Sequence, residues 1–215
     1  MRFASRLRSR SVAAAALAAT VLLAGCAPLL IGGAVVGGAL VATDRRTSGS
    51  LVDDEIIELK ARSRAGEVLG ERGTVTATSY NRMVLLTGEV PTEADKARAE
   101  QVIARIDNVQ AVVNEVTVGP MNTFGERSRD VLIAGKVKAS IVDAKDLFAN
   151  SIKVVVHRGT VYLMGRVTER EAVRASEVAR GVSGVTKVVR VFEVLSEAEL
   201  ANRAPRSAAR PASSP

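Results

Sequence analysis

Cys26 is the only cysteine of the chain, and its thiol is the strongest candidate for covalent chemistry. It directly follows Leu22-Leu23-Ala24-Gly25, the end of an uncharged run of mostly Ala, Val and Leu that begins at Ser11. Four arginines precede that run. A basic segment, an apolar segment and a small-residue cleavage site, in this order, are typical of a secretory signal. Because no second cysteine is present, we expect no internal disulfide after export, and the sulfur is available for another modification.

The segment that ends at Cys26 resembles the bacterial lipobox. The resemblance implies that the sulfur is diacylated, that residues 1–25 are removed as a signal peptide, and that the new amine of Cys26 is acylated. Three acyl chains, at about 0.8 kcal/mol per buried methylene, hold a protein stably on a membrane. Ala27 stands where enterobacterial sorting reads aspartate as an inner-membrane signal, so the expected location is the periplasmic face of the outer membrane. The alternative is an uncleaved anchor with an incidental thiol.

The other reactive side chains do not form a recognisable catalytic group. His157 is the only histidine, and its place beside Arg158-Gly159 indicates a solvated turn residue. Asp53-Asp54-Glu55 could be paired carboxylates, but we favour a helix N-terminus, where acids complement the backbone dipole. The glycines at 32–38 lack the lysine and the strand–helix context of a phosphate-binding loop. The sequence therefore predicts no enzyme, no cofactor and no metal site.

The charge is concentrated at the two ends of the chain. The formal net charge is +7, and loss of a signal peptide with four arginines and no acid leaves +3. Three further arginines lie in the Ala-, Pro- and Ser-rich segment 197–215, which cannot bury a core and is expected to be disordered. The body is therefore nearly neutral, and it contains no Trp. These features argue against a nucleic-acid partner.

Residues 26–50 are expected to form a lipidated, apolar, glycine-rich tether. The apolar run 27–43 is at the low end of the roughly 17–25 residues that a helix needs to span a bilayer. Its four glycines also weaken an isolated helix. We therefore expect a segment near the acyl anchor rather than a second membrane span.

The body of the chain contains an internal repeat. Residues 75–90 align with residues 152–167 at an offset of 77, which superimposes Gly88 on Gly165. Gly119-Pro120 breaks the pattern between the copies. The predicted organisation follows, listed in chain order: a first domain at 51–119, a linker at 120–128, a second domain at 129–196.

Each copy changes from helical to strand periodicity in the order αββαβ. The expected first helices are 52–66 and 129–148, the expected second helices are 92–106 and 169–181, and the expected last strands are 111–118 and 187–194. A glycine inside a strand, as at Gly88 and Gly165, indicates a bulge or a close backbone approach. The prediction is an α+β fold of two tandem helix-on-sheet sandwiches.

The first helices of the two copies differ on a helical wheel. In the first copy, Val52, Ile56 and Leu59 are assigned to the core, and the outer side is acidic. In the second copy the core stripe is Ile133, Val137, Ile141, Ala144 and Phe148. Its outer side carries Val131, Leu132, Gly135, Ala139 and Val142, flanked by Lys138 and Lys145. Such a face suits a membrane interface with anionic head groups. The residues alone favour equally a face that packs on the first domain or on a partner chain.

The repeats resemble the BON-domain family of small periplasmic αββαβ modules. The resemblance is carried by Val84 to Val90, by Val161 to Val167, and by the closing segments Asn108-Val109 and Ser183-Gly184-Val185. The segment Thr43 to Asp54 and the order of parts resemble the two-domain lipoproteins of this family. In those proteins the first helix of the second domain binds phosphatidylglycerol, and an aromatic anchor of that helix corresponds to Leu132.

The resemblance therefore implies a lipid-anchored outer-membrane protein that binds anionic phospholipids, phosphatidylglycerol and cardiolipin, through residues 131–145 and supports envelope integrity. The first alternative is a periplasmic protein-binding adaptor or chaperone-like envelope factor, with protein partners at the same face. The second is a purely structural role in which the domains pack on each other without a ligand.

Overall fold

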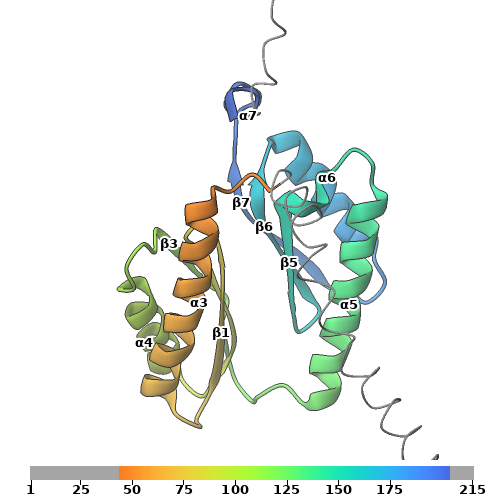
Figure 1. The fold of residues 1–215 in the computed structure, drawn as a ribbon. Helices are drawn as coiled ribbons and strands as arrows, with labels where there is room; N and C mark the ends of the chain where they lie inside the picture. Colours follow the sequence, from red (N-terminus) through yellow and green to blue (C-terminus); the bar gives the residue numbers. More distant parts are fainter. Residues whose placement is uncertain (1–43, 204–215) are drawn as a thin grey trace, which may run out of the picture. The chain divides into compact units, whose positions relative to one another are not determined.

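The first repeat of the structure, a computed structural model that describes residues 44–203, is a sheet with two helices. Its elements are α3 (Ser48–Leu69), β1 (Thr74–Tyr80), β2 (Met83–Val90), α4 (Glu93–Ala104), β3 (Ala111–Asn114) and β4 (Thr117–Val118). Strand β1 is antiparallel to β2, while β3 and β4 both lie parallel to β2. β2 is therefore the central strand of this sheet (Figure 1).

The second repeat has the same order of elements. These are α5 (Phe124–Asp143), the short 3-10 helix η2 (Ala149–Ser151), β5 (Ile152–His157), β6 (Thr160–Val167), α6 (Glu169–Arg180), β7 (Lys187–Val194) and α7 (Glu197–Arg203). Strand β6 is central, antiparallel to β5 and parallel to β7. The αββαβ order in both repeats confirms the predicted α+β fold.

Gly88 and Gly165 occupy equivalent positions where two strands approach closely. Gly88 pairs with Val75, and Gly165 pairs with Ile152. A Cβ atom at Gly88 would lie 2.0 Å from the carbonyl oxygen of Thr74, and one at Gly165 would lie 2.2 Å from that of Ser151. The predicted close backbone approach is confirmed, and it requires glycine at both sites.

Each repeat has its own apolar core between one face of the sheet and two helices. In the first repeat α3 and α4 enclose a core that includes Ile57, Leu86 and Ile103. In the second repeat α5 and α6 enclose Ile133, Leu163 and Ala175. This arrangement is the helix-on-sheet sandwich expected for a sheet with one apolar face.

A third core lies between the two sheets. It consists of buried residues from both repeats: Tyr80, Leu85, Tyr162, Met164 and Val191. The central strands β2 and β6 are therefore buried on both faces. Runs such as Val84-Leu85-Leu86, in which apolar residues follow one another without alternation, are typical of strands with two buried faces. The sequence analysis assigned only one apolar face to each sheet and missed this contact.

The core side of α3 is opposite to the predicted one. Ile57, Ala61 and Ala65 pack against the sheet, whereas Val52, Ile56 and Leu59 are 59%, 45% and 66% exposed. The helix turns its small alanines toward the sheet, together with Asp54, whose carboxylate has hydrogen-bond donors there.

The first helices also begin earlier than predicted. Helix α3 covers 48–69 instead of 52–66, and α5 covers 124–143 instead of 129–148. A capping box of Thr123 and Glu126 starts α5 inside the predicted linker. At the other end, Ala144 adopts an extended conformation that ends the helix. Asp53-Asp54-Glu55 consequently lie in the second turn of α3, not at its N-terminus, so the interpretation as dipole-complementing acids is wrong.

The chain ends are described only in part. Helix α7 forms where the disordered tail was predicted to begin, and the Ser196 and Glu199 side chains bond each other's backbone at its start. The rest of that tail, the predicted signal peptide, Cys26 and the tether up to residue 43 lie outside the described residues. Between residues 44 and 203, no helix is long and apolar enough to cross a bilayer.

Candidate functional site

Helix α5 carries the residues that the sequence analysis assigned to lipid binding. Its N-terminus is fixed by the capping box: the backbone N–H of Glu126 donates to Thr123 Oγ1 at 3.2 Å, and the backbone N–H of Thr123 donates to the Glu126 carboxylate at 2.7 Å. Ile133, Val137 and Ile141 are buried and hold the helix on the second sheet. The opposite side of α5 faces solvent.

The structure brings most of the predicted lipid-binding residues together on that exposed side. Six of them lie on α5 and are exposed: Val131, Leu132, Gly135, Lys138, Ala139 and Val142. The exposed fractions of Val131, Leu132 and Val142 are 71%, 66% and 60%. Lys145 is also exposed, but it follows the end of the helix at Asp143 and is not part of its face.

Phe124 extends this face, and the sequence analysis missed it. It is the first residue of α5 and is 79% exposed. At 100° per residue it lies on the same side as Gly135 and Val142. The face from Phe124 to Val142 is about 27 Å long at 1.5 Å per residue. The pattern Thr123-x-x-Glu126 is a capping-box signal that could have placed Phe124 in the helix.

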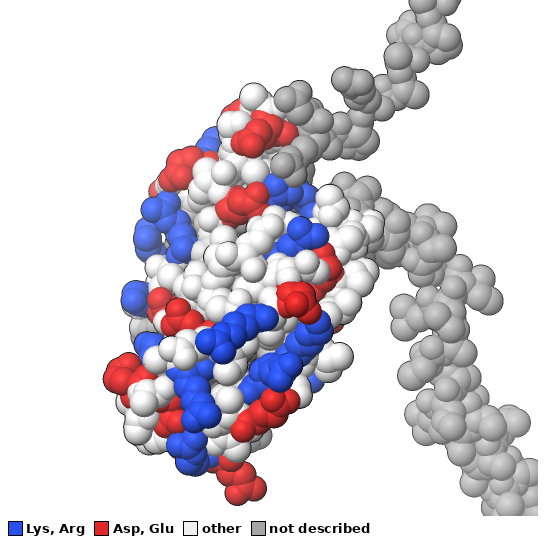
Figure 2. Space-filling model, turned by 90° about the vertical axis from the view of Figure 1, so that its left-hand side faces the viewer, with Lys and Arg blue, Asp and Glu red and all other residues white. Residues whose placement is uncertain are grey.

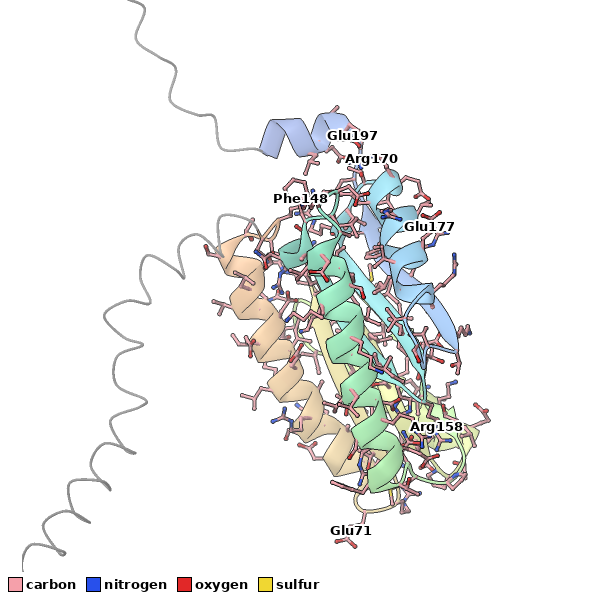
Figure 3. All side chains as sticks on the ribbon, turned by 90° about the vertical axis from the view of Figure 1, so that its right-hand side faces the viewer. Glu71, Phe148, Arg158, Arg170, Glu177 and Glu197 are labelled. Atoms are coloured by element: carbon pink, nitrogen blue, oxygen red, sulfur yellow. The ribbon has the colours of Figure 1, made fainter. Side chains whose placement is uncertain are left out.

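Phe148 was assigned to the core stripe of the second repeat, and this assignment is wrong. The helix ends before it, and Leu147 takes the buried position, which leaves Phe148 56% exposed. The guanidinium carbon of Arg45 lies 5.1 Å from its ring centroid. Phe148 lies near the C-terminal end of α5 (Figure 3). An exposed aromatic side chain therefore lies near each end of the exposed side of α5.

Exposed cations border the α5 face on both sides. On the helical wheel, Arg127 and Lys138 lie along one border, and Arg129 and Lys136 lie along the other. The face defined by Phe124, Val131, Leu132, Gly135, Ala139 and Val142, with these four cations, is called the α5 face below. Its composition combines apolar contact area with positive charge.

Helix α3 exposes apolar side chains as well, so the predicted contrast with an acidic first helix is wrong as stated. Val52, Ile56 and Leu59 form a shorter exposed stripe. Glu55 is exposed beside it, and no aromatic side chain occurs on α3. On the face of the molecule that Figure 2 shows, Lys and Arg side chains are interspersed with Asp and Glu. The two helices differ in the length and charge of their exposed stripes rather than in the presence of one.

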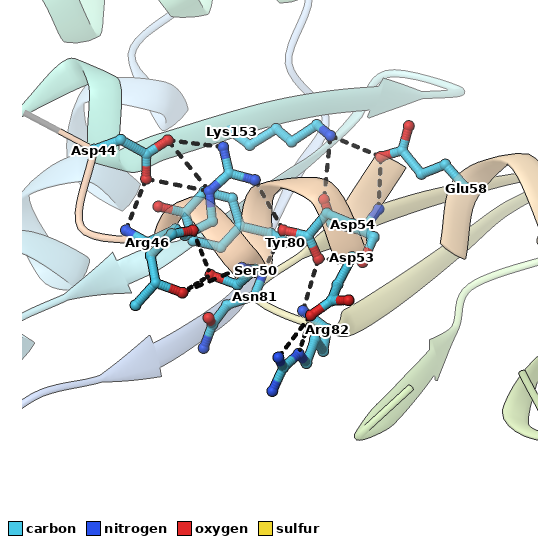
Figure 4. A network of polar contacts seen from close by, with 12 residues as sticks. Asp44, Arg46, Ser50, Asp53, Asp54, Glu58, Tyr80, Asn81, Arg82 and Lys153 are labelled. Carbon is cyan, nitrogen blue, oxygen red and sulfur yellow. Dashed lines mark hydrogen bonds and ion pairs between the residues drawn. The ribbon is translucent and has the colours of Figure 1, made fainter. Parts of the chain in front are cut away.

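The first helix of each repeat contains a buried aspartate whose carboxylate accepts hydrogen bonds from a hairpin turn. Asp54, 3% exposed, accepts hydrogen bonds from the backbone N–H groups of Asn81 (2.8 Å) and Arg82 (2.7 Å). It also accepts from Ser79 Oγ at 2.6 Å and from the Arg46 guanidinium at 2.9 Å (Figure 4). Asn81 and Arg82 both have positive φ, as a tight hairpin turn requires. The carboxylate therefore fastens the β1–β2 turn to α3.

The second repeat contains an equivalent aspartate with the same hydrogen bonds to a hairpin turn. Asp130 accepts from the backbone N–H groups of Arg158 (2.8 Å) and Gly159 (2.9 Å) in the β5–β6 turn. Both turn residues again have positive φ. Asp54 and Asp130 are thus structural acceptors, and the repeat preserves their role.

Residues 44–46 attach the start of the described chain to both repeats. Arg45 donates two hydrogen bonds to Glu171 at 2.6 and 2.8 Å and a third to the carbonyl of Arg166. Burial opposes ionisation of Glu171, but the hydrogen bonds from Arg45 and from the Thr168 backbone outweigh it and lower its pKa. Arg46 lies over the Tyr80 ring at 4.2 Å. Residues 44–46, which belong to the predicted tether, are therefore held against both repeats by these contacts.

His157 is not a solvated turn residue, in contrast to the prediction. It ends β5, its side chain is 14% exposed, and its Nε2 atom lies 3.1 Å from Oε1 of Glu89 in the first repeat. Glu89 is also paired with Arg158. Within the described part of the chain, no three His, Cys, Asp or Glu side chains are grouped as metal ligands would be. The histidine thus belongs to the contact between the repeats.

Comparison with known proteins identifies the repeats. The family model described as "BON domain" matches residues 53–120 and 129–196. The chain belongs to the BON-domain family. It is 38% identical over 182 residues to "Outer membrane lipoprotein DolP" of Haemophilus influenzae, covering 83% of this chain and 93% of that protein. The BON-domain chain described here is accordingly a lipoprotein of the outer membrane.

Two further comparisons are more distant. The chain is 32% identical over 151 residues to the "21 kDa hemolysin" of Actinobacillus pleuropneumoniae, covering 69% of this chain and 78% of that protein. A solved structure of CdsD, described as a structural protein of the type III secretion system of Chlamydia trachomatis, is 14% identical. That comparison covers 67% of this chain and 97% of CdsD with a TM-score of 0.29.

Proposed function

We propose that this protein is a non-enzymatic lipoprotein that is held by acylated Cys26 and binds anionic phospholipids through the α5 face, thereby supporting envelope integrity. The observation that carries the proposal is the α5 face itself, an exposed apolar stripe bordered by cations on both sides. Apolar side chains on such a helix enter the acyl boundary, while lysine and arginine contact anionic head groups. Phe124 adds an aromatic side chain of the kind that interfacial helices carry on their apolar side, and the exposed Phe148 lies near the other end of the helix.

The test is flotation of the soluble fragment 44–215 with phosphatidylglycerol or cardiolipin vesicles. Leu132→Glu places a charge in the α5 face and should abolish most binding, while the exposed position leaves the thermal unfolding nearly unchanged. Leu59→Glu on α3 is the matched control, because both leucines are 66% exposed. Binding of the Leu132→Glu protein equal to that of the parent contradicts the proposal, as does unfolding of that variant.

The cations provide a second readout. Lys138→Glu should weaken binding to anionic vesicles, since each lysine near such a surface contributes about 1 kcal/mol. This contribution should fade as salt rises, because the Debye length shortens to about 8 Å at physiological ionic strength. Phosphatidylcholine vesicles should bind poorly. Equal binding to neutral and anionic vesicles would remove the electrostatic part of the proposal.

The lipid anchor needs its own experiment. Cys26→Ser removes the only thiol and should abolish acylation, leaving an uncleaved or mislocalised precursor. Metabolic labelling with a palmitate analogue measures this directly. Labelling of the serine variant would refute acylation at Cys26.

A protein-binding adaptor is the second candidate, and the exposed stripe of α3 favours it. Val52, Ile56 and Leu59 lie beside Glu55, an acid that an anionic membrane would repel and a basic polypeptide would attract. An envelope defect in cells that carry Leu59→Glu, with vesicle binding intact, would support this role. A normal envelope in those cells would leave lipid binding as the favoured function.

A further inference from the structure

A cavity of about 310 Å³ lies beside the first turns of α5, next to the β5–β6 turn and the loop before β7. Arg158 of that turn lines the cavity and lies near the N-terminal part of α5 in Figure 3. The volume falls at the lower end of the range of small-molecule sites, roughly 300–1,000 Å³. The cavity therefore has room for a small molecule or for the end of a chain, but not for a folded element.

Asn122 is the unusual residue of this cavity. It is 4% exposed, and neither its Nδ2 nor its Oδ1 atom has a hydrogen-bond partner among the described residues. Its backbone carbonyl accepts a hydrogen bond from Arg127 at 2.8 Å, which fixes the residue in place. Buried amides are normally paired, because an unpaired one destabilises the fold. A ligand that pairs both atoms must offer an acceptor to Nδ2 and a donor to Oδ1.

Most charged groups of the cavity are bonded to other parts of the protein. Asp130 accepts from the backbone of the β5–β6 turn, and Glu126 accepts from the cap residue Thr123. The Arg158 guanidinium donates to Glu89 and to a backbone carbonyl. These groups shape the cavity, but their bonding positions toward a ligand are already taken.

Arg129 is the available charge. It lines the cavity, is exposed, and makes no hydrogen bond or ion pair with any described residue. Its planar guanidinium can donate two parallel N–H groups to a carboxylate or to a phosphate. The free groups of the cavity are therefore an anion-binding cation and an amide that offers one donor and one acceptor.

The acceptor of the amide distinguishes between the two anions. The last residue of a polypeptide carries a backbone N–H two bonds from its carboxylate carbon, so one residue supplies the acceptors and the donor together. A phosphodiester supplies acceptors alone. The cavity also has an apolar wall, where a Cβ atom at Gly184 would lie 3.1 Å from Cδ1 of Ile133. Such a wall suits an apolar side chain on the terminal residue.

We propose that this cavity binds the carboxyl terminus of a partner polypeptide, with Arg129 on the carboxylate and Asn122 on the backbone of the terminal residue. Nδ2 of Asn122 donates to a carboxylate oxygen, and Oδ1 accepts from the terminal N–H. Capture of a chain end is a recurring mode of peptide recognition. The inference goes beyond the proposed lipid binding and does not depend on it.

The test is an NMR titration of the full lipidated chain in dodecyl maltoside micelles with the peptide N-acetyl-glycyl-valine. We expect saturable shifts of the Asn122 side-chain amide and of the Gly159 N–H, and at least tenfold weaker binding of the same peptide with a terminal amide. Arg129→Gln should weaken binding about tenfold, as loss of a hydrogen bond to a charged group does. Arg98→Gln is the matched control and should bind like the parent, because Arg98 is an exposed arginine of α4 outside the cavity and the α5 face.

A second variant tests the amide itself. Asn122→Leu keeps nearly the same size without a polar atom, and we expect it to lose the saturable shift at Gly159. Retained peptide affinity in a folded Asn122→Leu protein would overturn the assignment; if that variant does not fold, the exposed Arg129→Gln decides.

Four other results would also overturn the assignment. These are no saturable shift in the parent protein, equal binding of the acid and amide peptides, equal binding by Arg129→Gln, and an affinity for acetate or dimethyl phosphate equal to that for the peptide. The last result would mean that the cavity takes an anion without regard to the N–H that Asn122 is proposed to bind.

Discussion

At the scale of single residues, the two buried aspartates occupy corresponding positions in the two repeats and have the same structural role. Asp54 and Asp130 each accept the two backbone N–H groups of a hairpin turn. Asp54 additionally binds Ser79 and Arg46. A carboxylate with several donors is a strong acceptor, because a charged group makes each hydrogen bond stronger.

This difference in donors predicts a difference in stability. Asp54→Asn should lower the free energy of unfolding by about 3 kcal/mol, since a buried amide would replace the charged acceptor of four donors. Asp130→Asn, with two backbone donors, should cost about 1.5 kcal/mol. Urea unfolding with an unchanged m value measures both. Equal losses, or a larger loss at Asp130, would contradict the assigned roles.

At the scale of elements, the order of helices and strands was predictable because each has a local pattern. The equivalent glycines and the Thr-x-x-Glu cap of α6 marked strands and helix starts directly. The face of α3 was not predictable from apolar periodicity, because several of the buried positions are taken by small or polar residues such as Ala61, Ala65 and Asp54. Phe124 was missed for a related reason: its helix starts at a cap inside a polar segment. The apolar residues of α5 that face solvent were found, because a second apolar stripe opposite the core is visible in the sequence.

The attachment of Arg45 to α6 predicts a pH dependence. The pKa of Glu171 is lowered in the folded protein from 4.5, so its ion pair stabilises the fold above that pH and is lost as the pH falls through the lowered pKa. Glu171→Gln should therefore reduce the melting temperature at neutral pH and flatten its decline on acidification. Glu177→Gln, on the same helix with a side chain that is 57% exposed, should leave both unchanged. If the melting temperature declines equally on acidification in the parent and in Glu171→Gln, this role is contradicted.

At the scale of the whole molecule, the contact between the two sheets could not be predicted from the repeat pattern. A repeat describes one unit, and the residues that join the units differ between them: Glu89 in β2 corresponds to Arg166 in β6 at the offset of 77. Glu89 meets His157 and Arg158 of the second repeat, while Arg166 bonds Glu193, which also accepts from Asn81. These opposite charges at equivalent positions favour pairing of the first repeat with the second over pairing of like repeats.

The tyrosines test this contact, because Tyr80 and Tyr162 are the only two in the chain and both belong to the core between the sheets. Burial, with a smaller contribution from Asp44 at Tyr80 and from Glu115 at Tyr162, raises the pKa of each phenol from 10.0 to about 12. Because the neutral phenols are favoured in the folded state, their contribution to stability is full below pH 10 and is lost as the pH rises toward 12.

Ultraviolet absorbance should therefore detect little phenolate in the folded chain near pH 10, and the urea-unfolded chain should titrate near the ordinary value of about 10. A fragment limited to residues 122–196, which keeps the whole of α5 and its cap, leaves the Tyr162 side of its sheet uncovered. Its tyrosine should therefore also titrate near the ordinary pKa even if the fragment melts cooperatively. Folded full-length protein in which both phenols ionise near pH 10 would mean that the sheets do not stay packed in solution. In that case each repeat would expose the apolar sheet face that now forms its half of the core between the sheets. The α5 face would then no longer be the main apolar surface available to a membrane.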